Sequence, residues 1–381
     1  MIDYTTDLSG LQEHLANRND STAVRINRML HMPDLTRTPA SPIWHITQAV
    51  TKVSALAHAE EVVFREIVPV EKNFDLLGIA ADHPSRRPTD TFYVDPDHVL
   101  RTQTTTMWPY YLQDPQVLKR LNEKGSVCAY SYGKVYRNDE IDRHHYPVFH
   151  QIDGLCLSRH SIKTFSTTDL ADILIEIAKT IYGLNVNCRV SDDSFPFTDP
   201  SLQLEIKWND QWLEVLGAGL VNPKVLQLLN LSPQEYNGWA FGFGLDRLAM
   251  IKMNIPDIRL FWSQDERVVR QFTGIDSLYR EVSNYPAVDR DISFIVSKTT
   301  ALNCFHEIVR ECGFSDDEDI IEEVTLLETY ANEKKFGADR VSYTFRIRYR
   351  SHVRTVTNDE INTVQENVRT MTSGQLGAVL R

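Results

Sequence analysis

The chain of 381 residues is 42% hydrophobic and 24% charged, which is ordinary for a soluble globular protein with room for two or three domains. Its formal net charge of -12 excludes binding to nucleic acid by bulk attraction, so any RNA contact must come from a local basic patch. No apolar run approaches the ~20 residues of a membrane span. The N-terminus has neither the apolar core of a secretory signal nor the Arg-rich composition of a transit peptide.

The five cysteines are scattered along the chain without a CxxC pair. They are Cys128, Cys156, Cys188, Cys304 and Cys312. This spacing predicts neither a zinc site nor a disulfide framework, and it fits a reducing compartment.

Two short helices are predicted in the polar N-terminal segment, over 11–16 and 24–30, and either Asp20 or Ser21 would cap the second. Three prolines then break the chain before residue 43. From 43 to about 66, apolar residues recur at helical spacing without Gly or Pro, which predicts one long helix.

A β-hairpin is predicted near the middle of the chain, because 134–137 and 147–153 alternate and a polar segment separates them. It would present four candidate ligand-binding side chains: Arg137, Asp139, His145 and Phe149. A guanidinium suits a phosphate because it is a planar, permanently charged fork of donors, and a phenyl ring can stack on a base. From residue types alone, a salt-bridged surface hairpin is an equally good interpretation.

Helices and strands are predicted on both sides of this hairpin. They are helices over 114–124 and 168–182, strands over 91–94, 202–206 and 212–216, and a turn-rich segment over 191–199. Small residues at 217–219 would let a ligand approach the backbone.

The pattern changes at residue 285, after a charged and partly helical stretch over 263–284. The elements predicted over 285–381 follow the order strand, helix, strand, strand, helix, strand, which is ferredoxin-like. A period of two over 345–350 puts arginines on one strand face. The predicted RNA-binding stripe is Arg346, Arg348, Arg350 and Arg354. A structural alternative is that these arginines pair with the acidic residues of segment 316–323.

Several stretches resemble landmarks of one enzyme family. KVYRNDEIDRHHYPVFHQIDGL (134–155) resembles motif 2 of class II aminoacyl-tRNA synthetases, in the form carried by phenylalanyl-tRNA synthetases. GWAFGFGLDRLAM (238–250) resembles motif 3, and IPDIRLFWSQDERVVRQF (255–272) resembles the segment after it. NFD (73–75) and DHPSR (82–86) are similar to further landmarks of the family. YPAVxxDISF, from residue 285, resembles the anticodon-binding domain of single-chain, organelle-type members.

The resemblance covers roughly residues 41–381 and implies an α+β fold, with a class II antiparallel sheet flanked by helices and a C-terminal ferredoxin-like anticodon-binding domain. The implied domains are an N-terminal extension (1–40), a catalytic domain (41–262), a linker (263–284) and the anticodon-binding domain (285–381). The implied reaction joins phenylalanine to tRNA(Phe) with ATP and Mg²⁺. A monomer is implied, in the mitochondrial matrix as a mature form if the source is eukaryotic, or else in the cytoplasm.

The resemblance also implies roles at the ATP site. Arg137 would hold the α-phosphate and Arg247 of motif 3 the γ-phosphate end, while His145 would help with the phosphate tail. Asp139 would face adenine and Phe149 would stack on it. Glu214 is a candidate for magnesium or ATP contact, although an ordinary polar position in a strand fits it nearly as well. No metal site made by the protein alone is predicted.

The implied amino-acid pocket has an aromatic end and a polar end. Phe195 and Phe197 would contact the phenylalanine ring, and Ala218 would leave room for it. Gln151 and Asp153 would hold the amino group, and Gln103 and Thr105 would lie beside it: Gln103, Thr105, Gln151, Asp153, Phe195, Phe197 and Ala218 form the predicted set.

The chain departs from the family at the polar end. It has Gln103-Thr104-Thr105 where the family carries His-Thr-Ser, and Asp153 where the family carries glutamate. Two alternatives therefore stay open: a paralogue that activates another aromatic or modified amino acid, and a non-catalytic RNA-binding paralogue. The intact Arg137 and Arg247 argue against the second.

Overall fold

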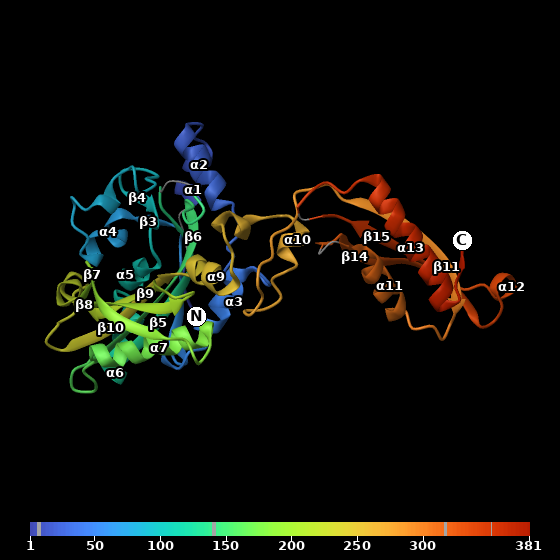
Figure 1. Ribbon diagram of the computed structural model, residues 1–381. Coiled ribbons are helices and arrows are strands. Elements are labelled where there is room, and N and C mark those ends of the chain that lie inside the picture. Colours follow the sequence, from blue (N-terminus) through green and yellow to red (C-terminus); the bar gives the residue numbers. More distant parts are fainter. Residues whose placement is uncertain (6–8, 139–141, 316–317, 352) are drawn as a thin grey trace. The chain divides into compact units, whose positions relative to one another are not determined.

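The structure is a computed structural model, and it describes residues 1–5, 9–138, 142–315, 318–351 and 353–381 (Figure 1). It divides into two units, residues 1–280 and residues 281–381. The first unit contains the described residues predicted to bind ATP and amino acid, and the second contains the predicted RNA-binding arginines. The N-terminal extension belongs to the first unit and is not a separate body.

Within the described residues, an eight-stranded sheet forms the centre of the first unit, in the order β1-β2-β5-β6-β10-β9-β8-β7. The strands are β1 (Ile2–Tyr4), β2 (Glu60–Phe64), β5 (Ser126–Tyr136), β6 (Val148–Arg159), β7 (Cys188–Phe195), β8 (Thr198–Trp208), β9 (Gln211–Val221) and β10 (Tyr236–Gly244). The pairs β1–β2 and β2–β5 are parallel and the others are antiparallel. The predicted hairpin over motif 2 is confirmed as β5 and β6.

Helices pack on the sheet in two groups. One group shares a hydrophobic core with β2, β5 and β6, and it comprises α5 (Met107–Leu112), α6 (Pro115–Lys124) and α8 (Pro223–Leu228). The other comprises α3 (Pro42–Val50), α7 (Thr167–Tyr182) and α9 (Leu245–Met253), which contact one another or β6, β8 and β9. The predicted helices α6 and α7 are confirmed, and both begin at side-chain caps, Asp114 for α6 and Ser166 for α7.

Three predictions about local structure were wrong. The long helix predicted over 43–66 ends as α3 at Val50, and β2 and β3 (Ile67–Pro69) follow it. The β-branched and aromatic residues of β2 pair with β1 and β5, and this tertiary pairing overrides the apolar period. The turn-rich segment 191–199 is mostly the hairpin of β7 and β8. The strand predicted over 91–94 is reduced to one bridge, from Tyr93 to Val99 of β4 (His98–Leu100).

The N-terminal extension is built into the catalytic sheet. It contains the two predicted helices, α1 (Ser9–Ala16) and α2 (Ser21–Leu30), and the Asp20 side chain caps α2 by accepting from the Ala23 amide. Its β1 adds a strand to the sheet edge at β2. The Nζ of buried Lys134 donates to the carbonyl oxygens of Leu30 and Met32, at 2.9 and 2.7 Å. These two hydrogen bonds attach the N-terminal extension to motif 2. A short helix, α4 (Val70–Asn73), follows β3.

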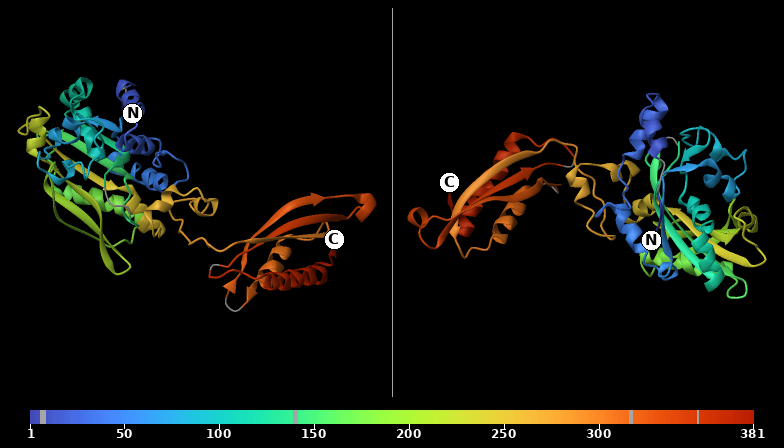
Figure 2. Two further views of the ribbon diagram at one scale, coloured as in Figure 1. Left: turned by 90° about the horizontal axis from the view of Figure 1, so that it is seen from above. Right: turned by 180° about the vertical axis from the view of Figure 1, so that it is seen from behind.

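The second unit has the predicted ferredoxin-like topology, with strand order β14-β15-β11-β16. Its elements are β11 (Val288–Ser297), α11 (Asn303–Gly313), β12 (Phe314–Ser315), β13 (Glu318–Asp319), β14 (Ile321–Tyr330), α12 (Glu333–Phe336), β15 (Arg340–Tyr349), α13 (Asn358–Leu376) and β16 (Val379–Leu380). Figure 2 shows both long helices on the same side of the strands. Phe294, Phe305 and Phe345 form the centre of the core beneath them, with ring centroids 4.5–5.9 Å apart. In the predicted linker, α10 (Glu266–Val269) is a single helical turn.

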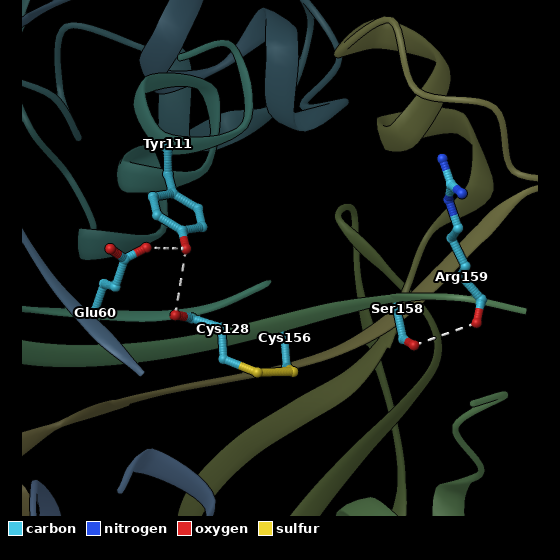
Figure 3. Close-up of a disulfide and its surroundings, with 6 residues drawn as sticks. All are labelled: Glu60, Tyr111, Cys128, Cys156, Ser158 and Arg159. Carbon is cyan, nitrogen blue, oxygen red and sulfur yellow. Dashed lines mark hydrogen bonds between the residues drawn. A yellow bond between two sulfur atoms is a disulfide. The ribbon is translucent and has the colours of Figure 1, made fainter. Parts of the chain in front are cut away.

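A disulfide joins Cys128 of β5 to Cys156 of β6 (Figure 3). The two residues lie directly opposite each other in the ladder, with Cα atoms 4.0 Å apart, although 28 residues separate them in sequence. The sequence indicated no disulfide, and this was wrong because cysteine spacing does not report cross-strand register. The Tyr111 hydroxyl donates to Glu60 at 2.7 Å beside this pair. In the part of the chain that the structure describes, no helix combines the length and the apolar character of a membrane span.

Candidate active site

A cavity of about 380 Å³ lies between β6, β9, β10, the turn from β7 to β8, and the loops over 79–91 and 102–108. Eight of the residues predicted to bind substrate line it: Gln103, Thr105, Arg137, Gln151, Asp153, Phe195, Phe197 and Ala218. They come from five separate stretches of the chain. The predicted amino-acid pocket is therefore assembled in one place, together with one of the two predicted phosphate arginines.

The aromatic end of this cavity is formed by three rings. Phe195 and Phe197 are nearly parallel, with centroids 6.0 Å apart and an interplanar angle of 5°. Trp108 meets Phe197 edge-on, at 5.9 Å and 73°. A Cβ atom at Gly217 would lie 2.8 Å from the Phe195 ring, so glycine is required there for the ring to keep its place. This arrangement offers ring faces and edges to a flat aromatic ligand.

The polar end is organised around the buried carboxylate of Asp153, which is 3% exposed. The Thr105 hydroxyl donates to Oδ1 at 2.5 Å, and the Thr104 hydroxyl donates to Oδ2. Burial raises the pKa of Asp153 to about 6, and the two hydroxyls and the charge of Arg137 oppose that rise. Among the described residues no cation forms an ion pair with this carboxylate. A buried negative charge without such a partner favours a cationic ligand.

Glycine on the neighbouring strand makes room for this carboxylate. Gly242 of β10 pairs with Asp153 of β6, and a Cβ atom at position 242 would lie 2.7 Å from Oδ1. The glycine-rich sequence of motif 3 thus has a local steric cause, and the buried Asp153 depends on it.

Asn73, from the NFD stretch, holds the turn that carries the two threonines. Its side chain donates to the Thr102 hydroxyl at 2.9 Å and accepts from the Thr106 hydroxyl at 3.0 Å. Gln103 donates to the Asn73 carbonyl at 3.4 Å, and the Thr104 amide donates to Gln151 Oε1 at 3.3 Å. The family landmark at 73 therefore acts on the pocket through the backbone at 102–106.

Arg137 and Phe149 form the side of the site predicted to bind ATP. Arg137 follows the last residue of β5, its Nε donates to the Thr102 carbonyl at 3.4 Å, and its guanidinium lies 5.2 Å from the Phe149 ring centroid. Phe149 is half-buried near the start of β6. The ring face that is predicted to receive adenine therefore already contacts a cationic, planar group.

Of the described residues predicted to bind ATP, Phe149, Arg247, Glu214 and His145 do not line the cavity. Arg247 is exposed in the first turn of α9, and Glu214 is exposed on β9. His145 is exposed, with Nδ1 3.0 Å from the Asp142 carboxylate. Asp139 lies outside the described residues. The predicted roles of all these residues remain predictions.

The cavity also includes residues to which the sequence analysis assigned no role. His83, Ser85, Asp90, Thr91 and Trp108 line it, and the Nδ1 of His83 lies 2.7 Å from the Ser85 hydroxyl. The signal that could have identified the first two is the DHPSR stretch, which resembles a family landmark. The resemblance alone did not say what that landmark contacts.

In the second unit, each arginine of the predicted RNA-binding stripe has a carboxylate partner. Arg346 pairs with Asp291 at 2.9 Å and Arg348 with Asp289 at 2.8 Å, both through two nitrogens. Arg350 pairs with Glu322 at 3.0 Å, and Arg354 pairs with Glu360 at 2.8 Å. The predicted alternation is confirmed, since Phe345, Ile347 and Tyr349 are buried on the other face. Three of the partners lie on β11 and α13, and the two others, Glu322 and Glu323, belong to the acidic segment 316–323, so the structural alternative is confirmed in part.

Comparison with known proteins gives the same division of the chain. Residues 25–272 match the family model for the tRNA synthetases class II core domain (F), and residues 283–381 match the model for the ferredoxin-fold anticodon binding domain. The chloroplastic/mitochondrial phenylalanine–tRNA ligase of Arabidopsis thaliana is 39% identical over 326 residues, which cover 83% of this chain and 71% of that protein.

Two mitochondrial phenylalanine–tRNA ligases match at similar levels. The one from Dictyostelium discoideum is 35% identical over 375 residues, covering 84% of this chain and 78% of that protein. The one from Mus musculus is 35% identical over 340 residues, covering 80% of this chain and 71% of that protein. With the class II core, the anticodon-binding domain and the assembled pocket, the chain belongs to the class II aminoacyl-tRNA synthetases, in the family of the mitochondrial and chloroplastic phenylalanine–tRNA ligases.

Proposed function

We propose that the chain activates phenylalanine with ATP and transfers it to tRNA(Phe). The observation that carries this proposal is one cavity with parallel phenyl rings at one end and a buried carboxylate at the other. A phenylalanine likewise has an apolar ring at one end, which matches the phenyl rings, and an α-ammonium group at the other, which matches the carboxylate. The test is charging of a tRNA pool with labelled phenylalanine by the full chain, and an acylated product other than phenylalanyl-tRNA(Phe) would contradict it.

The chemistry proceeds in two displacements. The phenylalanine carboxylate attacks the α-phosphorus of ATP and pyrophosphate leaves; a ribose hydroxyl of the tRNA then attacks the acyl carbon and AMP leaves. The first step needs no proton transfer, because the nucleophile is already an anion. It needs positive charge on the phosphates and a fixed substrate geometry. Arg137, at the cavity wall beside Asp153, supplies that charge where the carboxylate and the α-phosphate must meet.

Magnesium is proposed as part of the ATP complex and not as a resident metal. Among the described residues no cluster of three or more metal-binding side chains is present. Mg²⁺ commonly binds substrate phosphates and one or two carboxylates while it keeps several waters. Glu214, exposed on β9 and outside the cavity lining, is the predicted carboxylate.

The two phenyl rings are expected to set the amino-acid preference. Phe195→Leu or Phe197→Leu should raise the KM for phenylalanine by roughly 2- to 10-fold, because an aromatic pair contributes about 0.5–1.5 kcal/mol beyond burial. The KM for ATP should stay constant, as should both constants in Phe165→Leu, a half-buried ring outside the cavity. Pyrophosphate exchange measures all of these. Unchanged phenylalanine constants in both cavity variants would place the rings in the core instead.

A second candidate function is activation of another aromatic or modified amino acid. The observation in its favour is the polar end, where Gln103, Thr105 and Asp153 replace the family residues. The structure couples two of these changes, because the Thr105 hydroxyl donates to the Asp153 carboxylate. The coupling preserves a buried anion for an α-ammonium group, which every amino acid carries, so the choice between the two candidates depends on the aromatic end of the cavity. A non-catalytic RNA-binding role leaves this buried anion unexplained.

The second unit is proposed to bind the anticodon stem-loop of the tRNA through the stripe of Arg346, Arg348, Arg350 and Arg354. Their ion pairs do not prevent this, since exposed pairs contribute only about 0–1 kcal/mol and a phosphate can replace the carboxylate. Arg350 is the most buried of the four, and it also donates to the Tyr285 carbonyl at 2.7 Å. Arg346 and Arg348 are therefore the first candidates for phosphate contacts. Replacing either one by alanine should reduce the slope of log affinity against log salt concentration by about 0.7.

A chain that ends near residue 284 should separate activation from tRNA charging. It should keep pyrophosphate exchange, because the cavity lies within residues 79–242, and it should lose tRNA charging. Circular dichroism and thermal melting check that the shortened chain is folded. Charging at the rate of the full chain would show that the second unit is not needed for tRNA binding.

We further propose that the protein acts as a monomer and, because the relatives above are mitochondrial enzymes, that it works in the mitochondrion. The edge of the catalytic sheet at β2 is occupied by β1 of the same chain, which supports a monomer. Sedimentation of the full chain tests the first proposal and cell fractionation the second.

A further inference from the structure

We propose that His150 and Asp246 form a buried positioning pair that fixes Phe149 of motif 2 relative to Arg247 of motif 3, and that Leu35 of the N-terminal extension completes it. The inference rests on the proposed ATP roles of Phe149 and Arg247. Neither partner in the pair lines the substrate cavity. Both would act on ATP through their neighbours in sequence, as positioning residues.

The Asp246 carboxylate holds two groups of His150. One oxygen accepts from the His150 backbone amide at 2.6 Å, and the other lies 3.2 Å from Nδ1 of the ring. The histidine side chain is fully buried and Asp246 is 3% exposed. Since hydrogen bonds to a charged group are stronger than neutral ones, this link between β6 and the first turn of α9 is well fixed.

The far side of the ring contacts the N-terminal extension. The backbone amide of Leu35 donates to Nε2 of His150 at 3.2 Å, so Nε2 carries a lone pair and the proton is on Nδ1, facing Asp246. The Asp34 carboxylate is next nearest, 4.0 Å from Nε2, and Trp262 stacks on the ring with centroids 5.4 Å apart. A single tautomer thus satisfies both contacts.

The two residues beside this pair are those predicted to bind ATP. Phe149 precedes His150 on β6, so the hydrogen bond at the amide of His150 fixes the peptide group that joins them. Arg247 follows Asp246 in the first turn of α9. Phe149 and Gln151 point to the face of β6 opposite His150, because side chains alternate along a strand. The pair therefore sets the distance between the stacking ring and the phosphate arginine from behind the site.

The first test is Asp246→Asn, which keeps the volume of the side chain. An amide can accept from only one of the two His150 groups and presents a donor to the other. If Nδ1 loses its acceptor, the ring must either leave that proton unpaired or move it to Nε2, where it would face the Leu35 amide. The KM for ATP in pyrophosphate exchange should rise roughly 10-fold or more. The KM for phenylalanine should change less than twofold.

Two substitutions of the histidine resolve the two contacts. In His150→Asn the amide nitrogen takes the place of Nδ1 and can still donate to Asp246. In His150→Gln the terminal amide takes the place of Nε2, which keeps a partner for the Leu35 amide and removes the donor to Asp246. The proposal predicts that His150→Gln raises the KM for ATP more than His150→Asn does. Asp169→Asn, the same chemical change in the capping box at the start of α7, is the control and should alter neither constant.

The outcomes distinguish this inference from the function on which it rests. If Arg247→Ala raises the KM for ATP while Asp246→Asn and His150→Gln, melting as the wild type does, do not, the positioning pair is refuted and the ATP site stands. If phenylalanine and ATP constants rise together in Asp246→Asn, the pair has only a general structural role. If Arg247→Ala has no effect, the proposed ATP site itself is wrong.

Discussion

Replacing Arg137 by alanine is expected to reduce phenylalanine-dependent pyrophosphate exchange by ~10²- to 10³-fold, the usual cost of removing one donor from developing charge. Arg137 is the predicted phosphate ligand that lines the cavity, and its charge already acts on Asp153. The guanidinium contacts the Phe149 ring face rather than a hydrophobic core, so the fold should survive its removal. Thermal melting should therefore be close to that of the wild type.

Arg247→Ala should have an effect of similar size, expressed mainly in the KM for ATP. Arg189→Ala is a suitable control for both, because Arg189 forms an exposed ion pair with Glu205 at 2.7 Å and lies outside the cavity. Normal pyrophosphate exchange in a folded Arg137 variant would refute the proposed phosphate site.

Asp153→Asn is expected to weaken the binding of phenylalanine by roughly 10- to 100-fold, which is the range for the loss of a hydrogen bond to a charged group. The change removes the negative charge that would meet the α-ammonium group. It should not destabilise the fold, since it relieves a buried carboxylate that has no ion-pair partner among the described residues. The KM for phenylalanine and the melting temperature, measured together, separate binding from stability. A wild-type KM would mean that the amino group is held elsewhere.

The same carboxylate predicts a pH dependence. Burial raises the pKa of Asp153 to about 6, so the ionised form that binds an ammonium group is lost as the pH falls through that value. At about pH 5 only about a tenth of the sites are ionised, and the apparent affinity for phenylalanine should be ~10-fold weaker than at neutral pH. For stability the direction is opposite: because the pKa of this acid is raised in the folded state from 3.8 to about 6, the free energy of unfolding falls as the pH rises between these two values. Asp153→Asn should flatten the binding profile below neutral pH.

Elements with local signals were predicted correctly. The cap of α2, the helices α6 and α7, the motif 2 hairpin and the ferredoxin-like order of the second unit all follow from short-range patterns. The β2 strand was missed because its partners β1 and β5 are distant in sequence. The bond between Cys128 and Cys156 was missed for the same reason, since it depends on the register of β5 against β6.

The candidate site likewise combines features that the sequence could reveal with features that depend on residues distant in sequence. Resemblance identified eight residues that converge on the cavity, yet it could not reveal why the polar end tolerates its substitutions. That answer needed the geometry of three side chains, in which the hydroxyls of Thr104 and Thr105 bind the shorter carboxylate of Asp153. Gly242 supplies the space opposite, and only strand pairing shows this. The partners of Arg346 and Arg348 likewise come from β11, some 55 to 59 residues away.

Pyrophosphate exchange with each aromatic amino acid in turn tests the central claim most directly. The full chain with ATP, Mg²⁺ and phenylalanine should exchange label, and tyrosine should support exchange with a specificity constant lower by roughly 10²-fold, because an apolar pocket rejects an added hydroxyl only modestly. Tryptophan has a larger ring than phenylalanine, so its specificity constant should be lower still. Exchange that prefers another aromatic amino acid to phenylalanine, or no exchange with any of them, would contradict the account.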